Sequence, residues 1–287
     1  MFLNTNQSLI YLNPSFAGTN GYIRNQASYR NQWPNQTGNF ITYLNSFDAF
    51  IKPLNGGIAI SLLSDIQAHG TLKRTCFSLA YAQHFSFIKG KLKIIPSLQI
   101  AFGQERLDAS NLSYGDLLDA RYGIVWKSFG TTPSANKNYL DLTSGLLVNY
   151  KNLYLGAAVF HFNQPDIGLL GAFKLPPLYS MNLSCNKAIS ENTLLHFAAR
   201  LMQQQEKTIA QAAVNMVYKN FLVGLGYRSQ TTAFITAGFR YNNINCMLAY
   251  DRGFGKLYST PSSWELMLSF HSRKETPKGT TTNLENW

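Results

Sequence analysis

The chain has 287 residues, of which 45% are hydrophobic, 14% aromatic and only 14% charged. An average soluble domain carries roughly 25% charged residues. Few charges together with many aromatic residues argue against a disordered chain, because such a chain has ample apolar area to bury. The composition also lacks the Ala, Glu, Lys and Leu excess of a helical bundle. The formal net charge is +11, but the basic residues are scattered, with only Lys89, Lys91 and Lys93 close together. Because nucleic-acid-binding proteins concentrate basic residues on one face, we expect no nucleic-acid partner.

Alternating segments about ten residues long fill the region from residue 20 to 271. In segment 234–241, Ile235, Ala237 and Phe239 share one face, and the residues between them are polar or small. Segments 97–103, 195–201 and 265–270 repeat this period of two, which is typical of strands with two different faces. The sequence therefore predicts about 13 to 15 strands.

Turn residues separate these strands. Two-residue Lys/Asn turns between an aromatic and an apolar residue occur at 150–153, 218–221 and 241–244. Asn-Gly pairs at 20–21 and 55–56 and a Lys-Gly-Lys turn at 89–91 add to the predicted short hairpin connections. Longer polar segments at 106–119, 128–138 and 163–176 are predicted loops, and 272–287 is a predicted polar tail.

Strand length favours a membrane protein. A strand that crosses a bilayer at a tilt needs about 9–11 residues, whereas soluble strands average about 5–6. No run of 18 apolar residues occurs, which excludes a transmembrane helix. We therefore predict an all-β fold: an antiparallel transmembrane β-barrel of about 14 strands, with its apolar face toward lipid and long loops on one face. The alternative is a soluble sandwich or barrel with its apolar face inward.

Catalytic signatures are missing from the chain. It contains no phosphate-binding loop, nucleophile elbow or paired metal-ligand histidines. Asp116 and Asp119 lie three residues apart in a Ser/Gly-rich segment, where Asp commonly forms turns. The cysteines, Cys76, Cys185 and Cys246, form no metal-binding pair and are expected to be small apolar filler. We expect no enzymatic activity, no metal and no cofactor.

A series of motifs resembles the PorP/SprF family, membrane proteins of the Bacteroidetes type IX secretion and gliding machinery. The motifs occur in the family's order at 12–18 (LNPSFAG), 28–33 (SYRNQW), 57–65 (GIAISLLSD), 79–82 (LAYA), 155–165 (LGAAVFHFNQP), 226–228 (GYR), 249–251 (AYD) and 264–266 (WEL). Ala158 occupies a position where the family usually has Ser, and Trp264 one where His is common. The resemblance covers nearly the whole chain.

This resemblance implies three segments: a lead-in at 1–19, an outer-membrane β-barrel at 20–271 and the tail at 272–287. Because family members usually carry a signal peptide before such a lead-in, we expect Met1 to be an internal methionine. The implied function is to assist the secretion or surface attachment of large adhesins. The implied partners are outer-membrane lipid, other type IX secretion or gliding components, and the adhesins' C-terminal domains. A porin-like or fatty-acid-transporter-like channel for small solutes is the alternative.

The resemblance also singles out candidate residues for partner docking or family-specific structure: Asn13, Pro14, Arg30, Gln32, Trp33, His161, Gln164 and Pro165. The last three lie where a strand enters a long loop, and their alternative role is simply to end the strand. Trp33 is a candidate interfacial anchor.

Charged residues in a low-dielectric lumen are also expected to be paired, because an unpaired charge is costly there. We expect the carboxylates of Asp48, Asp65 and Asp251 to pair with inward arginines such as Arg30, Arg228 or Arg240.

Overall fold

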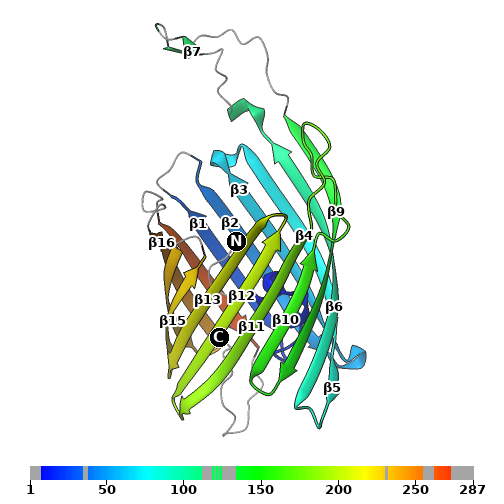
Figure 1. Cartoon of the computed structure of the whole chain (residues 1–287), viewed down its shortest axis with the longest axis vertical. Helices are drawn as coiled ribbons and strands as arrows, with labels where there is room; N and C mark the ends of the chain where they lie inside the picture. The colour runs from blue at the N-terminus through cyan, green and yellow to red at the C-terminus, as the bar shows by residue number, and fades with distance from the viewer. Residues whose placement is uncertain are drawn as a thin grey trace.

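The computed structural model describes residues 8–34, 38–111, 118–119, 121, 123–124, 134–229, 232–254 and 262–272. Across these residues one antiparallel sheet closes on itself, because β1 pairs with both β2 and β17 and β4 pairs with both β3 and β6 (Figure 1). The barrel has 14 strands, as predicted. None of the helices in these ranges has the length and apolar character needed to cross a membrane.

The barrel strands are β1 (Arg24–Gln32), β2 (Phe40–Ile51), β3 (Gly56–Gln67), β4 (Leu72–Gln83), β6 (Leu92–Leu107), β9 (Ala135–Tyr150), β10 (Leu153–Phe160), β11 (Leu178–Ser190), β12 (Thr193–Gln204), β13 (Lys207–Tyr218), β14 (Phe221–Arg228), β15 (Thr232–Tyr241), β16 (Ile244–Gly253) and β17 (Ser263–His271). Short β5 (Phe85–Phe87) pairs with β6, and β7 (Leu118–Asp119) pairs with β8 (Gly123–Ile124). The helical segments are α1 (Leu9–Leu12), η1 (Pro14–Phe16), η2 (Lys52–Leu54), η3 (Ala68–Gly70) and η4 (Ala109–Asn111).

The alternation predicted from the sequence sets the two faces of the barrel wall. On β15, Ile235 is 55% exposed on the outside, whereas its neighbours Phe234 and Thr236 are 3% and 2% exposed. The other strands follow the same pattern, with Leu, Ile, Phe and Tyr outside. An apolar outer belt on a closed barrel is the arrangement that lipid requires. The prediction of an outward apolar face is confirmed, and the alternative of a soluble sandwich is wrong.

Short turns gather at one end of the barrel, here called the short-turn end. The two-residue turns at 151–152, 219–220 and 242–243 each begin with a residue of positive φ, between 51° and 54°. Asn55 and the Lys89-Gly90-Lys91 turn also lie at this end, as expected. The Asn20-Gly21 pair makes no hairpin, because the segment before it is not a strand.

Longer connections gather at the opposite end, the long-loop end, near β7 in Figure 1. Residues 106–107 and 135–138 were expected in loops but belong to β6 and β9. The ladder between these strands continues to the pair Leu107 and Ala135. The backbone N–H and C=O groups of these residues therefore form hydrogen bonds between strands, which they would lack in a loop.

The interior of the barrel is packed with side chains. The inward residues Glu265 and Met267 are 0% exposed, and Met247 is 1% exposed. Met247 and Met267 form an apolar cluster with Val217 and Leu222. Barrels of 16 to 18 strands commonly enclose an aqueous channel, but here the inward side chains of β16 and β17 have almost no contact with water.

Candidate functional site

Residues 8–20, here called the plug, lie inside the barrel. The plug contains α1 and η1, and Pro14 occupies the first turn of η1, where its missing N–H costs nothing. The Asn13 side chain caps η1 because its Oδ1 accepts a hydrogen bond from the Ser15 backbone N at 2.9 Å. Both Asn13 and Pro14, predicted as candidates, are buried in the lumen.

An apolar surface joins the plug to the barrel wall. Leu9, Ile10 and Phe16 are each 5% exposed or less. They belong to one cluster with wall residues from β3, β4, β6, β9 and β10: Ala59, Ala80, Ala82, Ile95, Leu147 and Tyr154. The sequence predicted polar or small residues on the inward face, and Ile95, Leu147 and Tyr154 in this patch are the exceptions to that prediction. Small alanines leave room for the plug, and its apolar side chains are buried there from water.

Polar contacts fix the position of the plug. The Asn13 Nδ2 group donates to the backbone O atoms of Leu146 and Ala157, at 3.3 and 3.1 Å. The Ser15 hydroxyl lies 2.8 Å from that of Ser97. One amide side chain of the plug therefore binds the backbone of two adjoining strands, β9 and β10.

Two wall glycines permit this close approach. A Cβ atom on Gly57 would lie 2.0 Å from the Ala17 backbone O, and one on Gly145 would lie 2.3 Å from Asn13 Oδ1. Any side chain at either position would overlap the plug, so glycine is required for packing.

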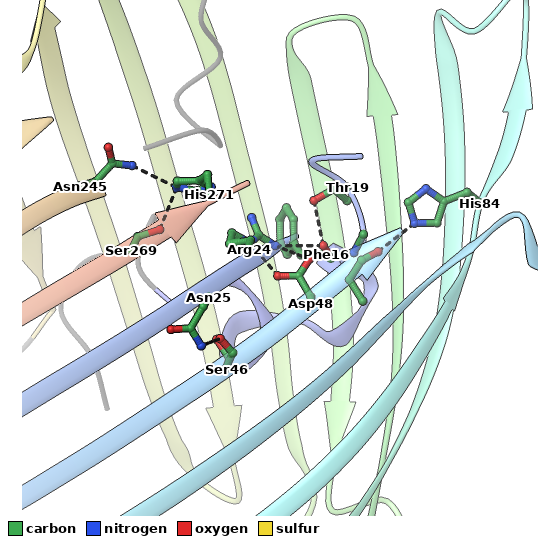
Figure 2. A network of polar contacts seen from close by, with 12 residues as sticks. Phe16, Thr19, Arg24, Asn25, Ser46, Asp48, His84, Asn245, Ser269 and His271 are labelled. Carbon is green, nitrogen blue, oxygen red and sulfur yellow. Dashed lines mark hydrogen bonds and ion pairs between the residues drawn. The ribbon is translucent and has the colours of Figure 1, made fainter. Parts of the chain in front are cut away.

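A buried ion pair holds the end of the plug where it meets β1. Arg24 on β1 and Asp48 on β2 point toward each other (Figure 2), with Arg24 Nε 2.7 Å from Asp48 Oδ1. Asp48 Oδ2 also accepts from the Gly18 backbone N at 2.9 Å, and Arg24 Nη2 donates to the Phe16 O at 3.3 Å. Each partner thus binds both its opposite charge and the plug backbone.

His84, which follows β4, contacts the same part of the plug. Its Nε2 lies 2.9 Å from the Ala17 backbone O (Figure 2). Burial lowers the pKa of His84 below its ordinary value, although the hydrogen bond to Ala17 opposes this. The neutral ring with a proton on Nε2 can donate to that carbonyl.

Arg30 lies where the barrel closes. Its Nη1 is 2.6 Å from Glu265 Oε2 on β17, and its Nη2 is 3.0 Å from Asp251 Oδ2 on β16. The second Asp251 oxygen accepts from the Ser263 backbone N at 2.9 Å. Arg30 and Glu265 are paired across the β1–β17 register, so this site joins the first barrel strand to the last two.

A further charged group crosses three strands. Arg74 on β4 pairs with Glu105 on β6, and the Tyr139 hydroxyl on β9 donates to the same carboxylate at 3.3 Å. The sequence did not identify this group, because its members meet only through the strand register.

The predicted pairing with inward arginines holds for two of the three carboxylates, and for one of them the partner is an arginine that was named. Asp251 does pair with Arg30, but Asp48 pairs with Arg24, which faces it across the β1–β2 register. Asp65 instead accepts hydrogen bonds from Thr42 and Gln67. Among the candidates named for pairing, Arg228 contacts Gln211 and Arg240 contacts Asn245.

The remaining two candidates from the 28–33 motif, Gln32 and Trp33, lie at the end of β1. Gln32 is its last residue and is half-buried. Trp33 follows with φ 59°, and its ring centroid lies 5.6 Å from that of Phe40 in an edge-on arrangement. Neither residue takes part in the contacts between the plug and the wall described above.

Loop 161–177, between β10 and β11, contains the last three candidates. His161 Nδ1 lies 2.7 Å from Asp141 Oδ2 on β9. Gln164 is exposed and its backbone N donates to the His161 O at 2.9 Å. Pro165 is buried, and its backbone O accepts from the Leu175 N. His161 thus joins the loop to β9, whereas the contacts of Gln164 and Pro165 lie within the loop.

Asp166 organises the rest of loop 161–177. Its Oδ1 accepts from the backbone N atoms of Gly168 and Phe173, at 3.0 and 2.8 Å, and its Oδ2 contacts Lys137 Nζ at 2.8 Å. The Lys137 hydrogen bond, helped by the two backbone donors, holds the pKa of Asp166 well below its ordinary value.

The described residues contain few side-chain groups suited to catalysis or metal binding. No group of three or more His, Cys, Asp or Glu side chains there could hold a metal ion. Asp116 lies outside the described residues, and so does the side chain of Asp119. The cysteines Cys76, Cys185 and Cys246 are free and half-buried.

Comparisons with known proteins agree with the barrel. The chain resembles the CymD monoaromatic hydrocarbon channel, with a TM-score of 0.54 at 11% identity over 91% of each chain. It resembles the Pseudomonas putida toluene transporter TodX with a TM-score of 0.52 at 12% identity over 94% of each chain. At such identity these likenesses show the fold alone. No curated protein matches the sequence.

The family model described as type IX secretion system membrane protein PorP/SprF matches residues 2–270. This match spans the plug and every barrel strand. The chain therefore belongs to the PorP/SprF family of type IX secretion system membrane proteins, and its barrel lies in the outer membrane.

Proposed function

We propose that this barrel is a non-enzymatic component of the type IX secretion or gliding machinery that assists the secretion or surface attachment of large adhesins. It does so by binding their C-terminal domains at the long-loop end. Family membership supports a role in type IX secretion. The observation that carries the finer proposal is the ordered, apolar surface of loop 161–177.

This loop presents apolar side chains to water from a fixed backbone. Phe162, Leu170 and Phe173 are 42%, 67% and 53% exposed, and the Asp166 hydrogen bonds hold the backbone between them. Exposed apolar groups on an ordered loop are typical of protein-binding surfaces. Extracellular loops are the long ones in outer-membrane barrels, which supports binding of a secreted partner at this surface.

The packed interior supports attachment over solute transport. A channel needs a water-accessible lumen, whereas the plug and the inward side chains of β13–β17 fill this one. A wall fixed to an internal plug makes a rigid support for a bound partner.

The test is a double substitution, Leu170→Asp with Phe173→Asp, in cells that export an adhesin. Charges at these positions oppose burial against a partner, and we expect surface adhesin to fall by about tenfold or more. Gln205→Asp, in the turn between β12 and β13, adds charge elsewhere on the same end and is the control. The amount of folded barrel in the outer membrane is measured in parallel.

Unchanged surface adhesin in the double variant, with normal barrel levels, contradicts the proposal. Liposome swelling of the wild-type protein addresses the alternative function directly. Graded entry of small sugars would favour a channel over an attachment role.

A further inference from the structure

Lysines concentrate at the short-turn end. The turns and strand ends at 49–57, 84–94, 149–154, 186–194, 217–222 and 240–245 are here called the basic rim. The rim contains seven lysines, Lys52, Lys89, Lys91, Lys93, Lys151, Lys187 and Lys219, together with Arg240 and a single acidic residue, Glu191. The nearby carboxylate of Asp48 is already bound to Arg24. A strong positive potential therefore surrounds this end of the barrel.

Two of these lysines contact tyrosines on the lipid-facing surface. Lys151 Nζ lies 5.4 Å from the ring centroid of Tyr150, and Lys219 Nζ lies 5.5 Å from that of Tyr218. Both tyrosines are about half exposed on the outside of the wall. A lysine above an interfacial tyrosine extends its ammonium group to the level of lipid head groups.

The hairpin of β5 and β6 repeats this arrangement. Phe87 and Ile88 are 47% and 63% exposed, and Lys89 and Lys91 follow them in the turn. Lys91 also joins the next turn, since its backbone O accepts from the Lys151 N at 3.0 Å. Apolar side chains next to lysines suit the boundary between hydrocarbon and head groups.

We propose that the basic rim binds the phosphates of anionic phospholipids in the leaflet that surrounds the short-turn end. Short turns of outer-membrane barrels face the periplasm, and the periplasmic leaflet consists of phospholipids. Each lysine near an anionic surface adds to the attraction between the rim and the lipid phosphates. Lys151 and Lys219 lie against outward tyrosines, and Lys89 and Lys91 follow the exposed Phe87 and Ile88, which favours lipid over an acidic protein at the barrel mouth.

The test compares lipids on the purified full-length barrel. The protein is reconstituted in nanodiscs of equal phosphatidylethanolamine and phosphatidylglycerol, and the lipids that remain bound on detergent release are counted by native mass spectrometry. We expect phosphatidylglycerol to be enriched about tenfold at low salt, and less at 0.5 M NaCl because exposed charges are screened.

The variant replaces Lys89, Lys91, Lys151 and Lys219 with Gln, and we expect it to lose the enrichment. The control replaces Lys73, Lys174 and Lys207, which lie toward the long-loop end, with Gln. We expect this control to keep the phosphatidylglycerol enrichment. Equal retention of the two lipids by the wild type, or unchanged enrichment in the rim variant, overturns the proposal. So does binding of soluble polyglutamate to the rim without any lipid preference, which would assign the rim to an acidic protein.

Discussion

Single residues in this barrel act by joining segments that are distant in the chain. Arg30 binds Asp251 and Glu265 where the first and last strands meet, and Asn13 binds two strands from within the plug. The sequence identified Arg30 and Asn13 through motifs. It named Asp48 as a carboxylate that pairs with an inward arginine, but it could not identify Arg24 as the partner, because the pairing depends on a strand register that no local pattern specifies.

Removing the Arg30 charge tests the closure site. Arg30→Met leaves Asp251 and Glu265 buried with one fewer cation, and we expect the free energy of unfolding to fall by about 3–5 kcal/mol. Lys137→Met breaks a partly exposed pair with Asp166 and is expected to cost no more than about 1 kcal/mol. Urea unfolding in lipid vesicles, followed by tryptophan fluorescence, measures both. Equal losses in the two variants would refute a special role for Arg30.

The sequence predicted the barrel strands well but did not predict the short helices of the plug. Strands such as β15 were predictable because lipid and lumen impose a period of two on every strand. The plug was not, because Leu9–Leu12 and Pro14–Phe16 are too short to show a helical period. Its clue was an Asn-Pro cap beside apolar residues, which the sequence alone assigned to a lead-in segment.

A cross-link tests the position of the plug. Ser15 and Ser97 have hydroxyls 2.8 Å apart, so Ser15→Cys with Ser97→Cys should form a disulfide under mild oxidation. The natural cysteines are first replaced with Ser, and each single variant is a control. The disulfide should shift the mobility of the denatured protein on a gel, and reduction should reverse the shift. Failure of a folded double variant to cross-link would place the plug elsewhere.

The molecule as a whole combines a lipid-facing wall, a filled interior and two unlike ends. The outer belt and the approximate strand number follow from composition and alternation. The filled interior does not, because it depends on how far the plug enters the lumen and on inward groups such as Met247 and Met267. The short-turn end carries the basic rim, and the long-loop end carries the apolar loop 161–177.

Single-channel conductance in planar bilayers tests the filled interior most directly. The purified wild-type barrel should give no stable current steps of porin size, because the plug fills part of the lumen and the inward side chains on β16 and β17 are almost completely buried. A variant lacking residues 8–20 has no plug and should conduct. Steady ohmic steps of porin size from the intact chain would contradict the account.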